Sequence, residues 1–127
     1  MNLVAVVSLL ALVEYMVIAG LVGSARGKYG VKAPATTGNE VFERYFRVQQ
    51  NTLEQLVVFL PALWLFANYV STSAGAIIGL AFIVGRVLYL RGYVADPEKR
   101  GTGFAISALA NVLLVLGGLG GAIVQVF

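Results

Sequence analysis

The stretch that decides the fold runs from Leu3 to Gly23 and reads LVAVVSLLALVEYMVIAGLVG. Only Ser8 and Glu14 interrupt its apolar character. About 20 mostly apolar residues are enough for a helix to cross the hydrocarbon core of a bilayer. The run is too long for the core of a signal peptide, and it has neither a basic segment before it nor a clear cleavage site after it. We therefore predict a first transmembrane helix over about residues 2–26.

Three further segments of similar length follow this run, and they predict helices over about residues 40–70, 72–95 and 97–127. Of the 127 residues, 59% are hydrophobic and 12% are charged, whereas about a quarter of an ordinary soluble domain is charged. The apolar runs are continuous, unlike the alternating strands of a membrane β-barrel. The predicted fold is therefore all-α, a single domain over residues 1–127 that forms an integral-membrane four-helix bundle.

Short motifs indicate where the helices begin and where they touch. Asn39 is expected to cap the second helix, and the two glutamates that follow it suit the positive end of the helix dipole. Asp96 followed by Pro97 is typical of a helix start. Gly117 and Gly121 have the GxxxG spacing that allows close contact between membrane helices. We interpret this pair as ordinary packing of small residues.

The basic residues are distributed unevenly along the chain. All nine fall at or near the loops that follow the first and third predicted helices. The positive-inside rule then places this charged side in the cytoplasm and both termini outside. The net charge of +3 is therefore a topology signal, and we expect no nucleic-acid partner. Short loops and ends suggest a bacterial inner-membrane protein. The nine are Arg26, Lys28, Lys32, Arg44, Arg47, Arg86, Arg91, Lys99 and Arg100.

The chain contains no cysteine and no histidine. This excludes disulfides, thiolate metal sites, a cysteine nucleophile and a Ser-His triad. We expect no metal site. Any chemistry must use arginine, tyrosine, glutamate or asparagine side chains, or a reactive group that a substrate brings.

One polar stripe lies on the second predicted helix. Arg47, Asn51 and Glu54 are spaced four and three residues apart, so they share one helical face. A guanidinium, an amide and a carboxylate together suit a zwitterionic ligand, because arginine can hold a carboxylate in a bidentate pair. The alternative is an internal Arg–Glu pair that joins helices.

A second stripe lies on the third predicted helix, where Arg86, Tyr89 and Tyr93 share a face. Tyrosine hydroxyls can donate to a carboxylate or a thiolate. The alternative is an aromatic belt at the membrane interface, with Arg86 reaching toward water. Arg91 lies off this face, and we expect it to be solvated.

Two further charged residues stand apart from the stripes. Arg100 is expected in the opening turns of the last helix, where its charge and the helix N-terminus would stabilise an anion such as a thiolate. Its alternative role is to set the topology. Glu14 lies near the middle of the first helix, and a charge at that depth is costly. It could be protonated, paired with an arginine of another helix, or a proton carrier.

In order and spacing, these motifs resemble the MAPEG family, the membrane-associated proteins in eicosanoid and glutathione metabolism. The resemblance runs from Ser24 to Arg100, about three fifths of the chain. The residues that carry it are Ser24-Ala25-Arg26, Thr36-Thr37-Gly38, Phe42-Glu43-Arg44, Phe46-Arg47-Val48-Gln49-Gln50-Asn51, Glu54, Pro61, Leu63-Trp64, Arg86, Tyr89, Gly92-Tyr93 and Arg100.

The resemblance implies a homotrimer that binds glutathione between adjacent subunits, toward the cytoplasmic side. Arg100 matches the arginine expected to stabilise the glutathione thiolate. Two side chains would come from the neighbouring subunit, Arg26 and Gln49. The side chains that would hold glutathione from one subunit are Arg47, Asn51, Glu54, Tyr89 and Tyr93. Arg86, which shares the face of the two tyrosines, is also expected to bind glutathione.

Two positions depart from the leukotriene-forming branch of the family. Gly27 stands where that branch has a second arginine, and Gln55 stands where it has a tyrosine. The non-enzymatic lipid-binding branch lacks the residues matching Arg47 and Glu54, which this chain has. The resemblance therefore favours a detoxifying glutathione transferase with glutathione as co-substrate. Its second substrate would be a hydrophobic electrophile, or a lipid hydroperoxide that a peroxidase activity would reduce.

Two other functions stay open at the level of sequence. A small proton-coupled multidrug exporter also has about this length, four helices and a glutamate like Glu14 in its first helix. A non-catalytic MAPEG scaffold would bind membrane lipid and form no thiolate.

Overall fold

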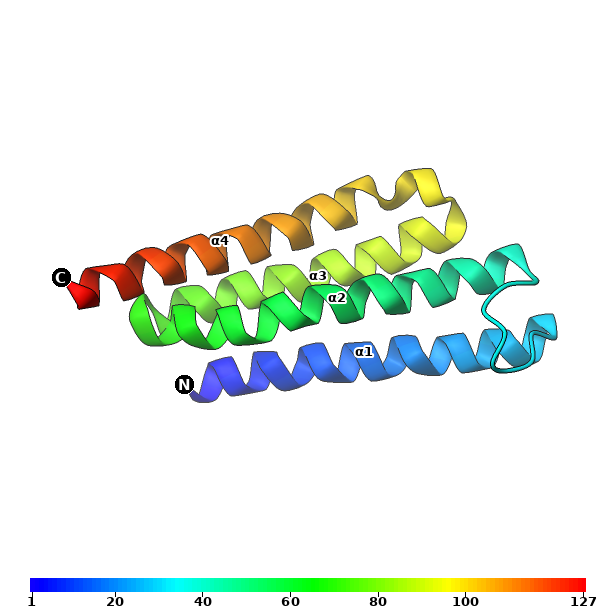
Figure 1. The fold of residues 1–127 in the computed structure, drawn as a ribbon, viewed down its shortest axis with the longest axis horizontal. Coiled ribbons are helices and arrows are strands. Elements are labelled where there is room, and N and C mark those ends of the chain that lie inside the picture. Colours follow the sequence, from blue (N-terminus) through cyan, green and yellow to red (C-terminus); the bar gives the residue numbers. More distant parts are fainter.

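The computed structural model describes all residues from 1 to 127. The chain forms α1 (Asn2–Tyr29), α2 (Glu40–Tyr69), α3 (Thr72–Ala95) and α4 (Gly101–Val126), with a 3-10 turn, η1 (Pro97–Arg100), before α4. In Figure 1, α2 and α3 lie in the middle of an up-and-down bundle, and α1 and α4 flank them. Both termini and the α2–α3 turn lie at one end, and the other two connections lie at the opposite end. The structure confirms the predicted all-α four-helix bundle.

Side chains cap two of the helix starts. Asn39 Oδ1 accepts a hydrogen bond from the backbone N–H of Phe42 at 3.0 Å, as predicted. Ser71 Oγ accepts one from the backbone N–H of Ala74 at 3.1 Å. Each bond satisfies one of the four donors that a helix leaves unpaired at its N-terminus, so short polar residues set the start of α2 and of α3.

Two helix bounds differ from the sequence prediction. Asp96 Oδ1 accepts a hydrogen bond from the N–H of Glu98 at 3.1 Å, but the segment it starts winds first as a 3-10 turn, so α4 begins at Gly101. The first helix extends to Tyr29 rather than to about residue 26, and it ends at Gly30, whose φ of 70° is left-handed. Such a conformation favours glycine because it has no Cβ.

The cap of α2 gives a testable effect on stability. Replacing Asn39 with alanine is expected to lower the free energy of unfolding by about 1 kcal/mol, because the N–H of Phe42 loses its acceptor. The apparent melting temperature in detergent would report this loss. Asn39→Ser keeps a capping oxygen and serves as the control. Equal losses in both variants would contradict a capping role.

The bundle interior is apolar around the middle of the helices and tightly packed. Phe59 of α2 stacks on Phe82 of α3, with ring centroids 4.0 Å apart and planes at 9°. Small residues bring α3 and α4 into backbone contact. A Cβ added to Gly85 would lie 2.8 Å from the backbone nitrogen of Ser107, and one added to Gly103 would collide with the backbone of Tyr89. This crossing therefore depends on glycine.

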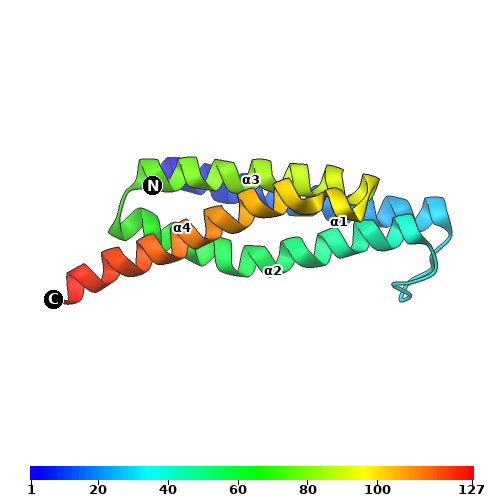
Figure 2. The ribbon, with the colours of Figure 1, turned by 90° about the horizontal axis from the view of Figure 1, so that it is seen from above.

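The GxxxG pair packs within the chain. A Cβ on Gly117 would lie 2.6 Å from the ring of Phe66, and a Cβ on Gly121 would lie 2.8 Å from the backbone oxygen of Tyr69. Both neighbours belong to α2, over which α4 runs obliquely in Figure 2. The structure thus agrees with ordinary small-residue packing at this pair.

All four helical segments are long and apolar enough to cross a membrane. Many of the side chains exposed on the outside of the bundle are large and apolar, among them Leu9 and Met16 of α1 and Leu116 of α4. Lipid accommodates such a surface, whereas water does not. The bundle therefore has the construction of a multi-pass integral membrane protein.

Candidate functional site

A polar cavity of about 290 Å³ lies between α2, α3 and the start of α4. It brings together residues that are far apart in the chain. Two guanidinium groups, one carboxylate, two amides, one phenol and one aromatic ring line it, and an anionic or zwitterionic ligand matches that set. Its lining residues are Asn51, Glu54, Gln55, Arg86, Tyr89, Arg100 and Phe104.

A short hydrogen bond joins the two predicted stripes inside this cavity. Asn51 Nδ2 donates to the hydroxyl oxygen of Tyr89 at 2.6 Å, which links α2 to α3. The hydroxyl accepts this bond, so its own hydrogen remains available to donate to a ligand. Tyr89 is buried, and the ring of Tyr93 lies beside it with centroids 5.5 Å apart. The polar residues of α2 and α3 therefore form one common wall of the cavity.

Arg86 forms the inner wall of the cavity and is only 1% exposed. Its Nε and Nη2 donate to Thr52 Oγ1 at 3.3 and 2.9 Å, and its Nη1 donates to Ser107 Oγ at 3.2 Å. The guanidinium also lies over the ring of Tyr89, 4.1 Å from its centroid. The alternative of an interfacial arginine that reaches toward water is therefore wrong, because hydroxyl groups of two other helices hold Arg86 inside the bundle.

Arg100 lies where η1 meets α4, exposed and at the edge of the cavity. Its Nη1 donates to the backbone oxygen of Pro97 at 2.6 Å. This bond crosses the 3-10 turn and holds the guanidinium near the start of α4, where the helix dipole adds positive potential. Glu54 lines the same cavity from the exposed surface of α2.

Four predicted residues do not line the cavity. Arg47 is exposed on α2 one turn from Asn51, and Glu54 is exposed as well, so neither is buried within the single chain as an internal Arg–Glu pair would require. Gln49 Nε2 donates to the hydroxyl oxygen of Tyr15 at 3.4 Å. Tyr93 touches the site only through the ring of Tyr89.

Arg26, the fourth, is occupied by the loop of its own chain. Its Nη1 donates to the backbone oxygen of Ala35 at 2.7 Å and to that of Val31 at 3.4 Å. Its guanidinium lies 4.8 Å from the ring centroid of Phe42. In this chain, Arg26 therefore orders the α1–α2 loop.

Besides Thr52, which accepts two hydrogen bonds from Arg86, sequence reasoning missed three polar residues near the site. Gln55 lines the cavity and accepts a hydrogen bond from Asn111 Nδ2 of α4 at 2.8 Å. Asn111 is 6% exposed, and its Oδ1 has no partner. Gln55 follows Asn51 by four residues, so the same helical spacing could have found it. Ser107 had no such signal, because its role depends on Arg86 of another helix.

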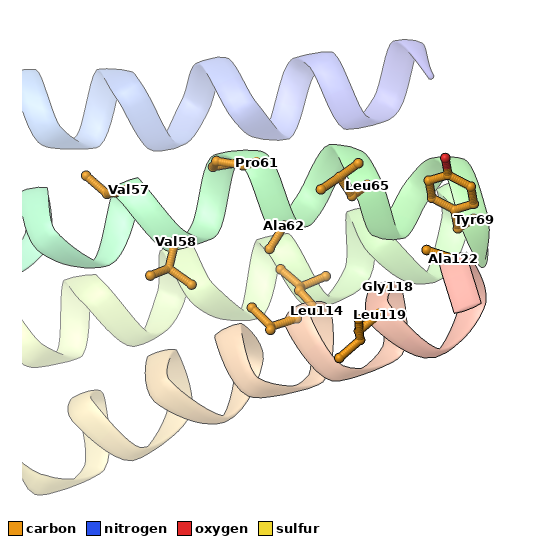
Figure 3. Close-up of a pocket in the computed structure, with 11 residues that line it drawn as sticks. Val57, Val58, Pro61, Ala62, Leu65, Tyr69, Leu114, Gly118, Leu119 and Ala122 are labelled. Atoms are coloured by element: carbon orange, nitrogen blue, oxygen red, sulfur yellow. The ribbon is translucent and has the colours of Figure 1, made fainter. Parts of the chain in front are cut away.

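An apolar groove lies away from the polar cavity. It has a volume of about 430 Å³ and runs between α2 and α4 toward the end that holds the termini. In Figure 3, Pro61 and Tyr69 of α2 and Leu114, Leu119 and Ala122 of α4 surround it. Its lining is almost entirely hydrocarbon, and the hydroxyl of Tyr69 is its one polar side-chain group.

The model of the MAPEG family matches residues 4–120, which is nearly the whole chain. The chain belongs to the MAPEG family.

Several relatives of this MAPEG protein share most of its length. An uncharacterized protein of Synechocystis sp. is 53% identical over 115 residues, which cover 91% of this chain and 84% of the relative. Microsomal glutathione S-transferase 2 of Homo sapiens is 42% identical over 119 residues, covering 93% and 81%. Leukotriene C4 synthase of Rattus norvegicus is 35% identical over 113 residues, covering 89% and 75%. Family membership and the four apolar helices together make this MAPEG protein an integral membrane protein.

Proposed function

We propose that this single-domain MAPEG protein is a membrane glutathione transferase that activates the glutathione thiol for conjugation to hydrophobic electrophiles. The observation that carries the proposal is the polar cavity in an otherwise apolar bundle, with two guanidinium groups, a carboxylate and a free phenol donor. Glutathione offers the complementary groups: two carboxylates, an ammonium and a thiol. The names of two relatives, a glutathione S-transferase and a leukotriene synthase, support the same reading.

Each residue of the cavity has a distinct role in this proposal. Glu54 accepts a hydrogen bond from the ligand ammonium. Asn51 and the hydroxyl of Tyr89, already joined at 2.6 Å, orient the peptide part. Arg86 supplies positive potential from the inner wall. Outside the cavity, Arg47 and Tyr93 hold the ends of the ligand.

Arg100 is the catalytic residue of the proposal. An unperturbed thiol has a pKa of roughly 8.5, so little thiolate exists at neutral pH. A guanidinium that stays protonated at any relevant pH, set at a helix start, favours the thiolate over the thiol. The thiolate then attacks an apolar electrophile that enters from the bilayer. The same thiolate is the reductant that a peroxidase reaction on a lipid hydroperoxide requires.

Glu54 also supports a site between subunits. It lies near the midpoint of α2, a helix of 30 residues, and its side chain is exposed on the single chain. A carboxylate facing lipid at that depth would be costly, so a neighbouring copy that covers it is favourable. We propose a homotrimer in which Gln49 and Arg26 approach the glutathione of the adjacent subunit, with Arg26 shared with its own loop. The charged loops would face the cytoplasm of a bacterial inner membrane.

Thiolate absorbance tests the proposed function directly. Glutathione added to the purified protein in detergent at neutral pH is expected to raise the ultraviolet absorbance of the thiolate band. S-methylglutathione is the matched control, because it can occupy the cavity but cannot ionise. Conjugation to 1-chloro-2,4-dinitrobenzene should follow the thiolate signal. Binding of both compounds without any thiolate signal would favour the non-catalytic lipid-binding scaffold instead.

A further inference from the structure

Arg86 of α3 belongs to a buried group of four polar side chains, one from each helix. Thr52 of α2 and Ser107 of α4 accept its hydrogen bonds, and both are fully enclosed. The fourth member is Glu14 of α1. Neither of its carboxylate oxygens has a hydrogen-bond partner, although both are buried.

The core contacts place Glu14 at the level of Arg86. Helices α1 and α3 pack against one another and run in the same direction. One core cluster contains Ala11 of α1 and Phe82 of α3. A neighbouring cluster contains Ile18 and Tyr89. Ile18 follows Ala11 on α1 by as many residues as Tyr89 follows Phe82 on α3. Glu14 lies between these two levels on the bundle-facing stripe of α1, and Arg86 lies between them on α3.

The unused hydrogen-bonding capacity of the two side chains is complementary. A guanidinium carries five N–H donors, and Arg86 uses three of them on Thr52 and Ser107. Two donors and a positive charge remain. Glu14 offers two buried oxygens that no other group uses. The acceptors that Arg86 already uses are neutral hydroxyls, so they do not balance its charge.

Arg86 in turn supports the polar cavity. Its guanidinium lies 4.1 Å from the ring centroid of Tyr89, and the hydroxyl of Tyr89 holds Asn51 at 2.6 Å. A shift of Arg86 toward any other acceptor would therefore move the wall on which Asn51 and Tyr89 meet. The contacts from Arg86 to Tyr89 and from Tyr89 to Asn51 thus connect the bundle interior with the cavity.

We propose that Glu14 of α1 is the buried counter-ion of Arg86 and a positioning residue for the glutathione cavity. This inference rests on the proposed function for its link to glutathione, but the pairing of Glu14 with Arg86 stands on packing and burial alone. Glu14 touches no ligand. It fixes the guanidinium, the guanidinium fixes the ring of Tyr89, and the hydroxyl of that ring sets Asn51.

The experiment compares Glu14→Gln, Glu14→Asp and Glu40→Gln, the last being an exposed glutamate at the start of α2. Glutathione binding is measured by titration calorimetry, and KM and kcat are measured with 1-chloro-2,4-dinitrobenzene. Glu14→Gln is expected to weaken binding and raise the KM for glutathione about tenfold, a typical coupling between members of one charge network, while kcat stays close to wild type. Glu14→Asp keeps the charge and should restore most of the affinity. Glu40→Gln should change neither quantity.

A stability cycle with Arg86→Gln tests the pairing without any ligand. Glu14→Gln should lower the apparent melting temperature of the wild type by several degrees. It should lower that of the Arg86→Gln variant much less, because the charge to be balanced is already gone. Equal losses in both backgrounds would overturn the pairing. If the cycle shows coupling and the wild type does not bind glutathione, the pairing stands and the proposed function fails. If the wild type binds glutathione and Glu14→Gln binds it equally well, the positioning role is overturned.

Discussion

Replacing Arg100 with alanine is expected to remove the thiolate absorbance and to lower the conjugation rate about 100-fold, the usual cost of deleting one preorganised group that stabilises an anion. Arg100 is exposed, and its side chain forms a hydrogen bond within its own turn, to the backbone oxygen of Pro97, so its loss should leave the bundle intact. Glutathione binding should weaken much less than the rate, because Asn51, Glu54 and Tyr89 still line the cavity. Absorbance and stopped-flow rates on the same sample would separate the two effects.

Arg91→Ala is the matched control for this prediction. Arg91 is also exposed and lies at the same charged end, but it lines a shallow depression with Tyr45 and Leu90 rather than the polar cavity. It should keep both the thiolate signal and the rate. Similar losses in the two variants would mean that general positive charge, rather than Arg100 itself, stabilises the anion.

Replacing Gly103 with alanine is expected to destabilise the protein by about 2–3 kcal/mol, a large effect for one added methyl group. Its Cβ would collide with the backbone nitrogen and Cα of Tyr89, and it would lie 2.7 Å from the backbone oxygen of Gly85. These atoms belong to helical backbone and cannot rotate away, so α4 must separate from α3. The apparent melting temperature in detergent would fall, and glutathione binding would fall with it because Tyr89 moves.

Gly120→Ala in the same helix is the control for this substitution. No atom lies within 4 Å of a Cβ at that position, so only helix propensity changes, and alanine is the better helix former. Its melting temperature should equal or slightly exceed that of the wild type. A Gly103→Ala variant as stable as Gly120→Ala would show that the α3–α4 contact can relax.

The bundle is largely predictable from the sequence because its signals are local. Twenty apolar residues identify a membrane helix without reference to the rest of the chain, and Asn39 marks a helix start through a bond to a residue three positions away. Such local sequence signals do not distinguish a 3-10 turn from the first turn of an α-helix. Asp96 correctly indicates a start, but only the structure shows that the first turn is a 3-10 turn.

The site is predictable to a smaller extent. Helical spacing correctly identifies the faces that hold Asn51 and Glu54 and, on α3, Arg86 and Tyr89, and the structure brings these faces together. Spacing along one helix cannot tell how deep a side chain lies. The burial of Arg86 depends on hydroxyls from two other helices.

The same limit applies to residues whose partners lie elsewhere. Arg47 shares a face with Asn51 but lies outside the single-chain cavity, because the face continues beyond the point where α3 and α4 enclose it. Arg26 is engaged by a loop whose path no periodicity encodes. Both statements describe one chain, and the proposed neighbour would add contacts that no single helix pattern contains.

The basic side chains lie toward one end of the bundle, and this uneven distribution has a consequence for the side of the membrane on which the reaction takes place. The end formed by the termini and the α2–α3 turn carries no basic side chain, whereas the polar cavity lies toward the opposite end, beside Arg100. Under the proposed function, a water-soluble thiol peptide would reach the cavity from one compartment only, whereas a hydrophobic partner would enter laterally from the bilayer. In sealed vesicles of uniform orientation, the reaction should run on one side of the bilayer and leave the pool on the other side untouched. The protein would convert hydrophobic molecules that are dissolved in the membrane, and it would release their water-soluble products into one compartment only.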